Sequence, residues 1–152
     1  MEFEESRSIM RLFRRVAMAQ HRRKDALLRQ HGLQPGQDII LVELWRLGPC
    51  SQAELAAAVL VDEPSVTRSV VRLERRGLLS RSPDPADSRR RIVTLSAEGA
   101  ALIPTMQAIY EQITRELLGD AGDVAYLVDR LTDIATRLGR EDPEQAPAPP
   151  GH

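Results

Sequence analysis

Residues 51–77 decide the fold, and they read SQAELAAAVLVDEPSVTRSVVRLERRG. The segment contains two helix starts. Ser51 and Glu54 form a capping box, in which each side chain bonds the backbone N–H of the other residue. Asp62 is an acidic cap, and Pro64 suits a first turn because its missing N–H would be unpaired there anyway. The stretch therefore predicts two short helices joined by a tight turn and closed by a glycine.

The second of these helices has two different faces. At about 100° per residue, Val66, Val70 and Leu73 gather on one side. The other side carries hydroxyl and guanidinium groups, from Ser65, Arg68, Arg72 and Arg75, flanked by Ser69 and Arg76. This face suits the major groove of DNA, where arginine binds guanine or phosphate and small hydroxyls approach base edges. The alternative is a solvated face, but such faces normally mix charge signs, and Glu74 is the only acid between Pro64 and Ser82.

After residue 77 the pattern changes from helix to strand. Residues 78–82 and 91–95 read as two short strands around a segment rich in proline and aspartate, which predicts a hairpin. Three arginines, 89–91, lie at or just after its tip, and a narrow minor groove attracts inserted arginine. Asp87 makes sense there as a partner that holds one guanidinium at a fixed angle. A surface turn with a salt bridge is the alternative for this segment.

The flanking segments predict longer helices. One runs from about 5 to 31, a second opens at Pro35 and stops at Gly48, and a helix capped by Ser96 runs to about 118 with a kink at Pro104. A last helix covers about 123–138. We therefore expect a mainly α fold with a small β-hairpin. Its parts are an N-terminal dimerisation helix (1–33), a winged helix-turn-helix DNA-binding domain (34–99), C-terminal dimerisation helices (100–139) and a disordered tail (140–152).

The long helices carry more apolar side chains than a winged unit of roughly 65 residues can cover. The positions that need another surface are Leu12, Val16, Leu117, Leu118, Leu127, Leu131, Ile134 and Leu138. A two-fold dimer supplies that surface, and it would read a pseudo-palindrome with half-sites about one helical turn apart.

The net charge of −1 hides a strong asymmetry. Residues 65–91 hold eight arginines against three acids, whereas residues 101–152 hold four arginines against nine acids. The positive field is therefore confined to the second short helix and the hairpin, which is the electrostatic footprint of localised DNA binding.

The sequence lacks the residue patterns typical of metal-binding proteins, enzymes and membrane proteins. The single cysteine excludes an internal disulfide and a cysteine-based zinc site, and three scattered histidines form no metal motif, so we expect no metal and no cofactor. No nucleophile–base pair, phosphate loop or carboxylate pair points to an enzyme. No apolar run reaches membrane-spanning length, and the acidic N-terminus is unlike a signal peptide. We expect a soluble, cytoplasmic protein without a membrane partner.

Residues 41–102 resemble the MarR family of bacterial transcription factors (multiple antibiotic resistance regulators). The matching stretches are Ser51-Gln-Ala-Glu-Leu55, Pro64-Ser-Val-Thr-Arg68, Leu73-Glu-Arg-Arg-Gly-Leu78, Asp87-x-Arg89 and Val93-Thr-Leu-Ser96-x-x-Gly99. The flanking helices match as well. The resemblance implies a homodimer with interdigitated terminal helices, located in the bacterial cytoplasm on the nucleoid. It also implies a recognition helix in the major groove and Arg89, braced by Asp87, in the minor groove.

The residues that we expect to contact double-stranded DNA lie on both short helices and on the wing. They are Gln52, Ser65, Thr67, Arg68, Ser69, Arg72, Arg75, Ser88, Arg89 and Arg90. The resemblance further implies a repressor that is released by a small phenolic or anionic effector, bound between the dimerisation helices and the winged domain. No residue pattern identifies the residues that bind this effector.

Two alternatives stay open at this stage. The first is a winged unit that serves protein–protein contact instead of DNA binding. A redox-responsive regulator is the other alternative, because Cys50 precedes a helix N-terminus that would lower the pKa of its thiol. Redox-sensing members of the family carry their cysteine in the first helix, where this sequence has none.

Overall fold

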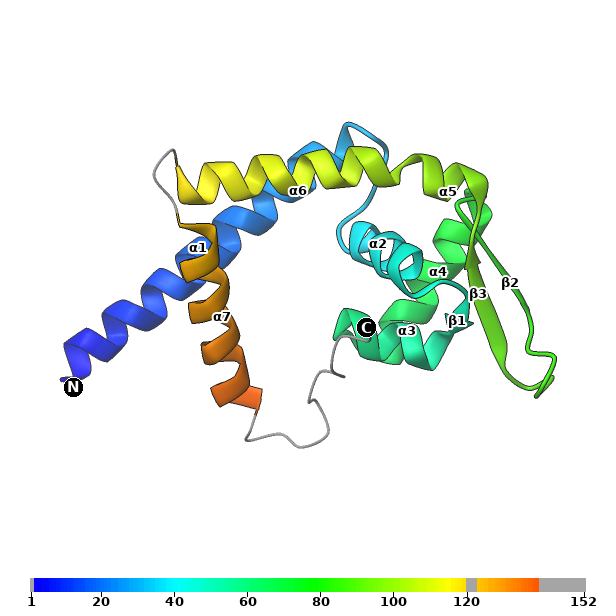
Figure 1. The fold of residues 1–152 in the computed structure, drawn as a ribbon, viewed down its shortest axis with the longest axis horizontal. Helices are drawn as coiled ribbons and strands as arrows, with labels where there is room; N and C mark the ends of the chain where they lie inside the picture. The colour runs from blue at the N-terminus through cyan, green and yellow to red at the C-terminus, as the bar shows by residue number, and fades with distance from the viewer. Residues whose placement is uncertain (1, 120–122, 140–152) are drawn as a thin grey trace.

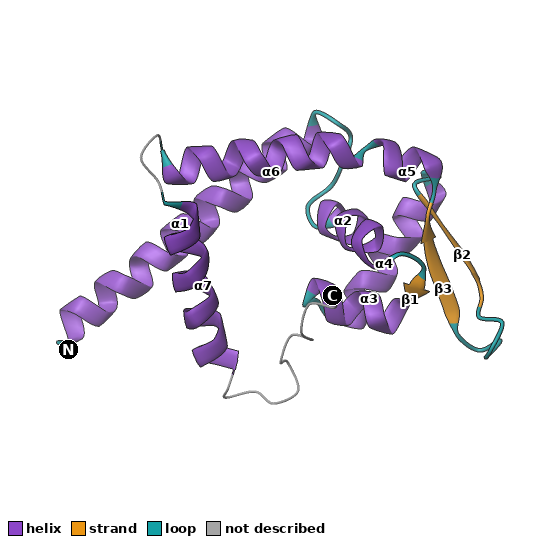
Figure 2. Cartoon of the chain, in the orientation of Figure 1, coloured by secondary structure: helices purple, strands orange, loops and turns teal. Residues whose placement is uncertain are grey.

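The computed structural model describes residues 2–119 and 123–139 (Figure 1). Its elements are α1 (Phe3–Arg29), α2 (Gln37–Leu47), β1 (Cys50–Ser51), α3 (Gln52–Val59), α4 (Glu63–Arg75), β2 (Leu79–Pro83), β3 (Arg91–Leu95), α5 (Ala97–Ala101), α6 (Ile103–Leu118) and α7 (Val124–Gly139). The predicted fold class, mainly α with a small antiparallel sheet, is confirmed (Figure 2). The tail expected to be disordered lies outside the described residues.

The described chain has two parts, which we call the frame and the winged unit. The frame comprises α1, α6 and α7; α1 contacts α6, and the N-terminal half of α1 extends away from it (Figure 1). The winged unit comprises α2, α3, α4 and the three strands, and α5 joins it to α6. No helix in the described residues is both long and apolar enough to cross a membrane.

A continuous apolar core joins the two parts. Leu41, Leu55 and Leu73 of the winged unit are fully buried, and so are Leu28 of α1 and Met106 of α6. Each such side chain stabilises the fold by roughly 1.5–3 kcal/mol through the water it excludes. Because α1 and α6 contribute to the same core as α4, the winged unit is packed against the end of the frame.

A buried polar cluster lies at the same junction. The carboxylate of Asp38, on α2, is fully buried and lies 2.9 Å from the Lys24 ammonium of α1. The Tyr110 hydroxyl of α6 donates to the same carboxylate oxygen at 2.7 Å. Burial, followed by the charge of Asp38, raises the pKa of the Tyr110 hydroxyl, which therefore remains a donor. Three helices are thus joined at one carboxylate, and removing Lys24 would leave a buried charge without its cation.

The local start signals act as expected at α3 and α4. Ser51 and Glu54 exchange both bonds of the capping box, at 2.7 and 3.2 Å, and the Asp62 carboxylate accepts from the backbone N–H of Ser65 at 2.9 Å. The expected start of α2 at Pro35 is wrong. Gly36 is the N-cap, at φ +81°, and the helix begins one residue later. Only glycine enters that left-handed region without steric cost, so it sets the boundary.

Two features of the chain after α2 differ from the expectation. Cys50–Ser51 forms a third strand, β1, that pairs with Val93 and Ile92 of β3 and makes the strand order β1-β3-β2. A two-residue strand is too short to leave a pattern in the sequence. The kinked helix expected from Ser96 to about 118 is divided at Leu102 into α5 and α6, because Pro104 fits the first turn of a new helix better than a helix interior.

Candidate nucleic-acid interface

Helix α4 separates its side chains as its periodicity predicts. Val66, Val70 and Leu73 are buried, and at most 1% of the surface of each residue is exposed to solvent. Arg68, Arg72 and Arg75 are exposed, on the side away from the core. The burial of one face leaves the basic face free to approach a polyanion without disturbing the packing.

The polar side chains near the start of α4 bond to one another. The Arg68 guanidinium donates to the Ser65 hydroxyl at 2.8 Å, which lays Arg68 along its own helix. The Gln52 amide of α3 donates to the Thr67 hydroxyl at 3.1 Å, and that hydroxyl donates to the Glu63 carbonyl at 2.9 Å. The structure thus brings Gln52 of α3 to α4, although fifteen positions separate it from Thr67 in the sequence.

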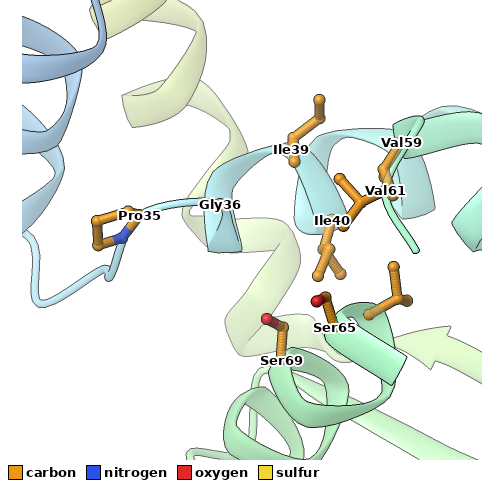
Figure 3. A pocket seen from close by; sticks show the side chains of 9 residues that line it. Pro35, Gly36, Ile39, Ile40, Val59, Val61, Ser65 and Ser69 are labelled. Carbon is orange, nitrogen blue, oxygen red and sulfur yellow. The ribbon is translucent and has the colours of Figure 1, made fainter. Parts of the chain in front are cut away.

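A small cavity lies beside this face (Figure 3). Its volume is about 180 Å³, below the range typical of drug-sized ligands. Its walls are formed by α2, the α3–α4 turn and α4, from Pro35, Gly36, Ile39, Ile40, Val59, Val61, Ser65, Val66 and Ser69. The hydroxyls of Ser65 and Ser69 point toward this space, so these two predicted DNA-contacting residues lie at the edge of the basic face.

The wing is the β2–β3 hairpin, and its exposed tip carries Asp87, Ser88, Arg89 and Arg90. The expected bond from Asp87 to a guanidinium is wrong in its geometry. The Asp87 carboxylate accepts from the backbone N–H of Arg89 at 3.0 Å, and the Asp87 carbonyl accepts from Arg90 N–H at 2.9 Å. In a tight turn the N–H two residues on is the nearest donor, so aspartate shapes the backbone that presents the arginines.

One ion pair that the sequence did not suggest connects the wing to α4. Glu74 accepts three bonds from Arg81 of β2: from the backbone N–H at 3.1 Å, from Nε at 2.9 Å and from Nη2 at 2.6 Å. The guanidinium holds the pKa of the Glu74 carboxyl below its usual value. Arg81 is therefore neutralised within the fold. Glu74 is the only acid in an arginine-rich stretch, and this isolation was the sequence feature from which the ion pair could have been predicted.

Cys50 does not have the environment that a reactive thiol needs. Its side chain is buried in β1, and burial, together with the charge of Glu54, raises the pKa of the thiol. The alternative in which the nearby helix N-terminus lowers the pKa of the thiol is contradicted, because desolvation outweighs the helix end. Within residues 2–119 and 123–139 no group of three His, Cys, Asp or Glu side chains could hold a metal ion.

The frame exposes large apolar side chains, as expected for several of the positions singled out in the sequence. Leu12 and Val16 of α1 are 56% and 52% exposed, and Leu131 and Leu138 of α7 are 49% and 70% exposed. Leu117 is exposed as well, whereas Leu118, Leu127 and Ile134 are partly covered. Helix α7 buries none of its residues although its apolar side chains gather on one face. Exposed apolar side chains gathered on one face of a helix are typical of an interaction site.

Comparison with known proteins agrees with this architecture. The family model described as "MarR family" matches residues 33–91. The chain is 36% identical, over 128 residues, to the HTH-type transcriptional repressor NicR of Pseudomonas putida, an alignment that covers 78% of this chain and 81% of NicR.

Two solved structures share the fold at recognisable sequence identity. A mutant MarR from E. coli in complex with operator DNA superposes with a TM-score of 0.77 at 26% identity, covering 88% of this chain and 98% of the other. BpsR of Bordetella bronchiseptica, a structure described as explaining how 6-hydroxynicotinic acid regulates DNA binding, gives a TM-score of 0.69 at 30% identity, covering 86% of this chain and 98% of the other.

Proposed function

The chain belongs to the MarR family of DNA-binding transcriptional regulators, and we propose that it is a homodimeric repressor released from its operator by a small aromatic acid. The observation that carries this proposal is the division of α4 into a buried apolar face and an exposed basic face. Arginine on such a helix binds guanine O6 and N7 or backbone phosphates in the major groove. The operator complex of the E. coli relative supports the same use of the fold.

In this proposal the wing reads the adjacent minor groove. Arg89 enters the groove, where the negative potential is enhanced if the groove is narrow, and Arg90 and Ser88 contact the backbone. Asp87 contributes by shaping the turn, since its carboxylate bonds the N–H of Arg89. The bonds between Glu74 and Arg81 keep the wing at one angle to α4, so both grooves are approached together.

Dimerisation through the frame completes the proposal. The exposed leucines and valines of α1, α6 and α7 support a two-fold interface, with residues 1–33 and 100–139 as the dimerisation segments and 34–99 as the DNA-binding domain. The acidic residues 101–152 keep that interface away from DNA, while the two positive winged units face the two half-sites.

The DNA-binding test uses two variants and the intergenic DNA upstream of the protein's own gene. R68A and R89A should each weaken binding about 5- to 150-fold, the loss expected for one good base or groove contact. R22A, which removes an exposed arginine of α1, is the matched control and should bind like the wild type. Fluorescence anisotropy at fixed salt measures all four proteins. Unchanged affinity in both R68A and R89A would exclude this interface. A wild-type protein without DNA affinity at low salt would favour the protein-contact alternative.

The effector test follows from the ligand described for BpsR. 6-Hydroxynicotinic acid is a hydroxylated aromatic carboxylate, which fits the phenolic or anionic class implied by the family resemblance. We expect it to release the protein from operator DNA and to raise the melting temperature, with a stabilisation of about 2.7 kcal/mol at a hundred times Kd. Benzoate, which lacks the hydroxyl and the ring nitrogen, is the control ligand. If neither property changes with 6-hydroxynicotinic acid, the effector belongs to another chemical class.

A further inference from the structure

Arg76 lies at the C-cap of α4, but its guanidinium is turned away from the DNA-facing arginines. Its Nη1 donates to the carbonyl oxygen of Gly32 at 2.6 Å and lies 3.5 Å from the Oε1 atom of Gln37. Gly32 belongs to the turn that closes α1, and Gln37 is the buried first residue of α2. One side chain therefore connects the recognition helix to the point where the frame passes into the winged unit.

Three features make this contact specific. The Gly32 carbonyl lies just beyond the C-terminal end of α1, where the helix dipole is negative and attracts a cation. The Gln37 side chain is itself fixed, because its Oε1 accepts from the backbone N–H of Gln34 at 3.0 Å. Gly32 also has φ +71°, and a Cβ there would lie 3.2 Å from Nη2 of Arg76. The turn therefore fits closely around the guanidinium.

The neighbouring Arg75 shows the contrast. Both residues are exposed, but Arg75 has no hydrogen-bond or ion-pair partner within the described residues, so its charge is free for a phosphate. Arg76 carries the same charge one residue later, but its Nη1 already donates a hydrogen bond to the Gly32 carbonyl. The two arginines are adjacent in the sequence, but their guanidinium groups have different environments.

We propose that Arg76 is a positioning residue for operator binding: it sets the angle of α4 against the frame and thereby the separation of the two recognition helices. This inference rests on the proposed function, since the separation matters only when a dimer reads two half-sites. Half-sites about one helical turn apart require that separation to be held closely. A hydrogen bond between a charged donor and a backbone carbonyl is strong enough to bias such an angle.

The experiment compares R76M with R75M, which lose the same charge and keep most of the aliphatic stem. Each is titrated by fluorescence anisotropy onto the natural operator and onto an operator with one base pair inserted between the half-sites. Wild type should prefer the natural spacing. R76M should bind the natural operator about five-fold more weakly than wild type does, and should bind the operator with the insertion with nearly wild-type affinity. Its preference for the natural spacing therefore falls. R75M should weaken binding to both operators equally. It should also reduce the steepness of log K against log salt concentration by about 1.8, because each dimer loses two phosphate contacts.

Two results would overturn the proposal. One is a loss in R76M that is equal on both operators, which would make Arg76 an ordinary phosphate contact. The other is an R76M protein with wild-type affinity for both. Circular dichroism melts verify that R76M is folded, and R76Q against R75Q provides the same comparison if R76M melts below the assay temperature. Failure of the proposed function is seen separately, as a wild-type protein that is monomeric or does not bind the natural operator.

Discussion

At the scale of single residues, close backbone approaches decide which side chains the fold tolerates. Ser96 holds the junction between β3 and α5: its hydroxyl donates to the Gly77 carbonyl at 2.6 Å and accepts from the Gly99 N–H at 3.0 Å. These bonds draw the first turn of α5 against the strand that begins after Gly77. As a result, a Cβ at Gly99 would overlap the carbonyl oxygen of Leu78 and crowd the Leu95 side chain.

G99A should therefore destabilise the protein. The neighbour that must move is backbone, so the expected cost is about 1–3 kcal/mol, or a melting temperature several degrees lower. G139A is the control, because a Cβ at Gly139 meets nothing within 4 Å, and it should stay within about 0.5 kcal/mol of wild type. Urea unfolding of both variants measures the difference. Equal stabilities would show that the α5 junction relaxes around the methyl group.

At the scale of elements, polar contacts hold the frame helices together. Arg23 of α1 donates from Nε and Nη2 to the two carboxylate oxygens of Glu116 on α6, at 2.9 and 2.8 Å. Bonds from Arg23 and then from Gln112 lower the pKa of the Glu116 carboxyl to about 2. The contact is exposed, so its contribution to stability is modest and screened by salt.

The lowered pKa of Glu116 gives a pH prediction with a definite sign. A carboxyl whose pKa falls on folding contributes stability above its unfolded pKa, near 4.5, and loses that contribution as pH falls toward about 2. E116Q removes the titrating group, so its free energy of unfolding should fall less steeply than that of wild type between pH 5 and pH 2. R23M should flatten the profile in the same direction because the carboxyl loses its main partner. Urea titrations across this range test both, and a wild-type slope in E116Q would contradict the prediction.

At the scale of the whole molecule, charge and apolar surface are separated along the chain. Residues 65–91 of the winged unit carry a net positive charge, with eight arginines against three acids, and the frame exposes leucine and valine. A lone copy would leave α7 with no buried residue, which is an unstable arrangement for an amphipathic helix. In the proposed dimer, a second copy supplies the surface that covers this face.

L131E should therefore weaken the dimer and, with it, operator binding. Leu131 is 49% exposed on α7, and a charge at the centre of an apolar interface costs several kcal/mol when it is buried without a partner. L47E, at a 40% exposed leucine of α2 in the winged unit, is the control and should remain dimeric. Light scattering at micromolar concentration gives the mass of each. A dimeric L131E protein with full operator affinity would exclude α7 from the interface.

Several features of this protein could be predicted from the sequence because their causes are local. The capping box at Ser51, the proline and aspartate at the start of α4 and the spacing of Val66, Val70 and Leu73 all act within a few residues. They predict the helix-turn-helix and the two faces of α4, and the strand and turn residues of 78–95 predict the hairpin after it. The DNA-contacting residues assigned to those elements remain predictions, now with known exposure and hydrogen-bond partners.

Only the tertiary structure decided which polar groups are already occupied. Arg76 and Gly32 are 44 residues apart, and Asp38 and Tyr110 are 72 apart, so no local pattern relates them. The same holds for β1, which exists only because β3 lies beside it. The sequence by itself determined a basic helix and a basic hairpin, since periodicity and capping are properties of a short segment. Packing determined that Arg81 and Arg76 bond to other parts of the fold, whereas Arg72 and Arg75 have no such partner within the described residues. A hydrogen bond forms only where the folded chain brings donor and acceptor together.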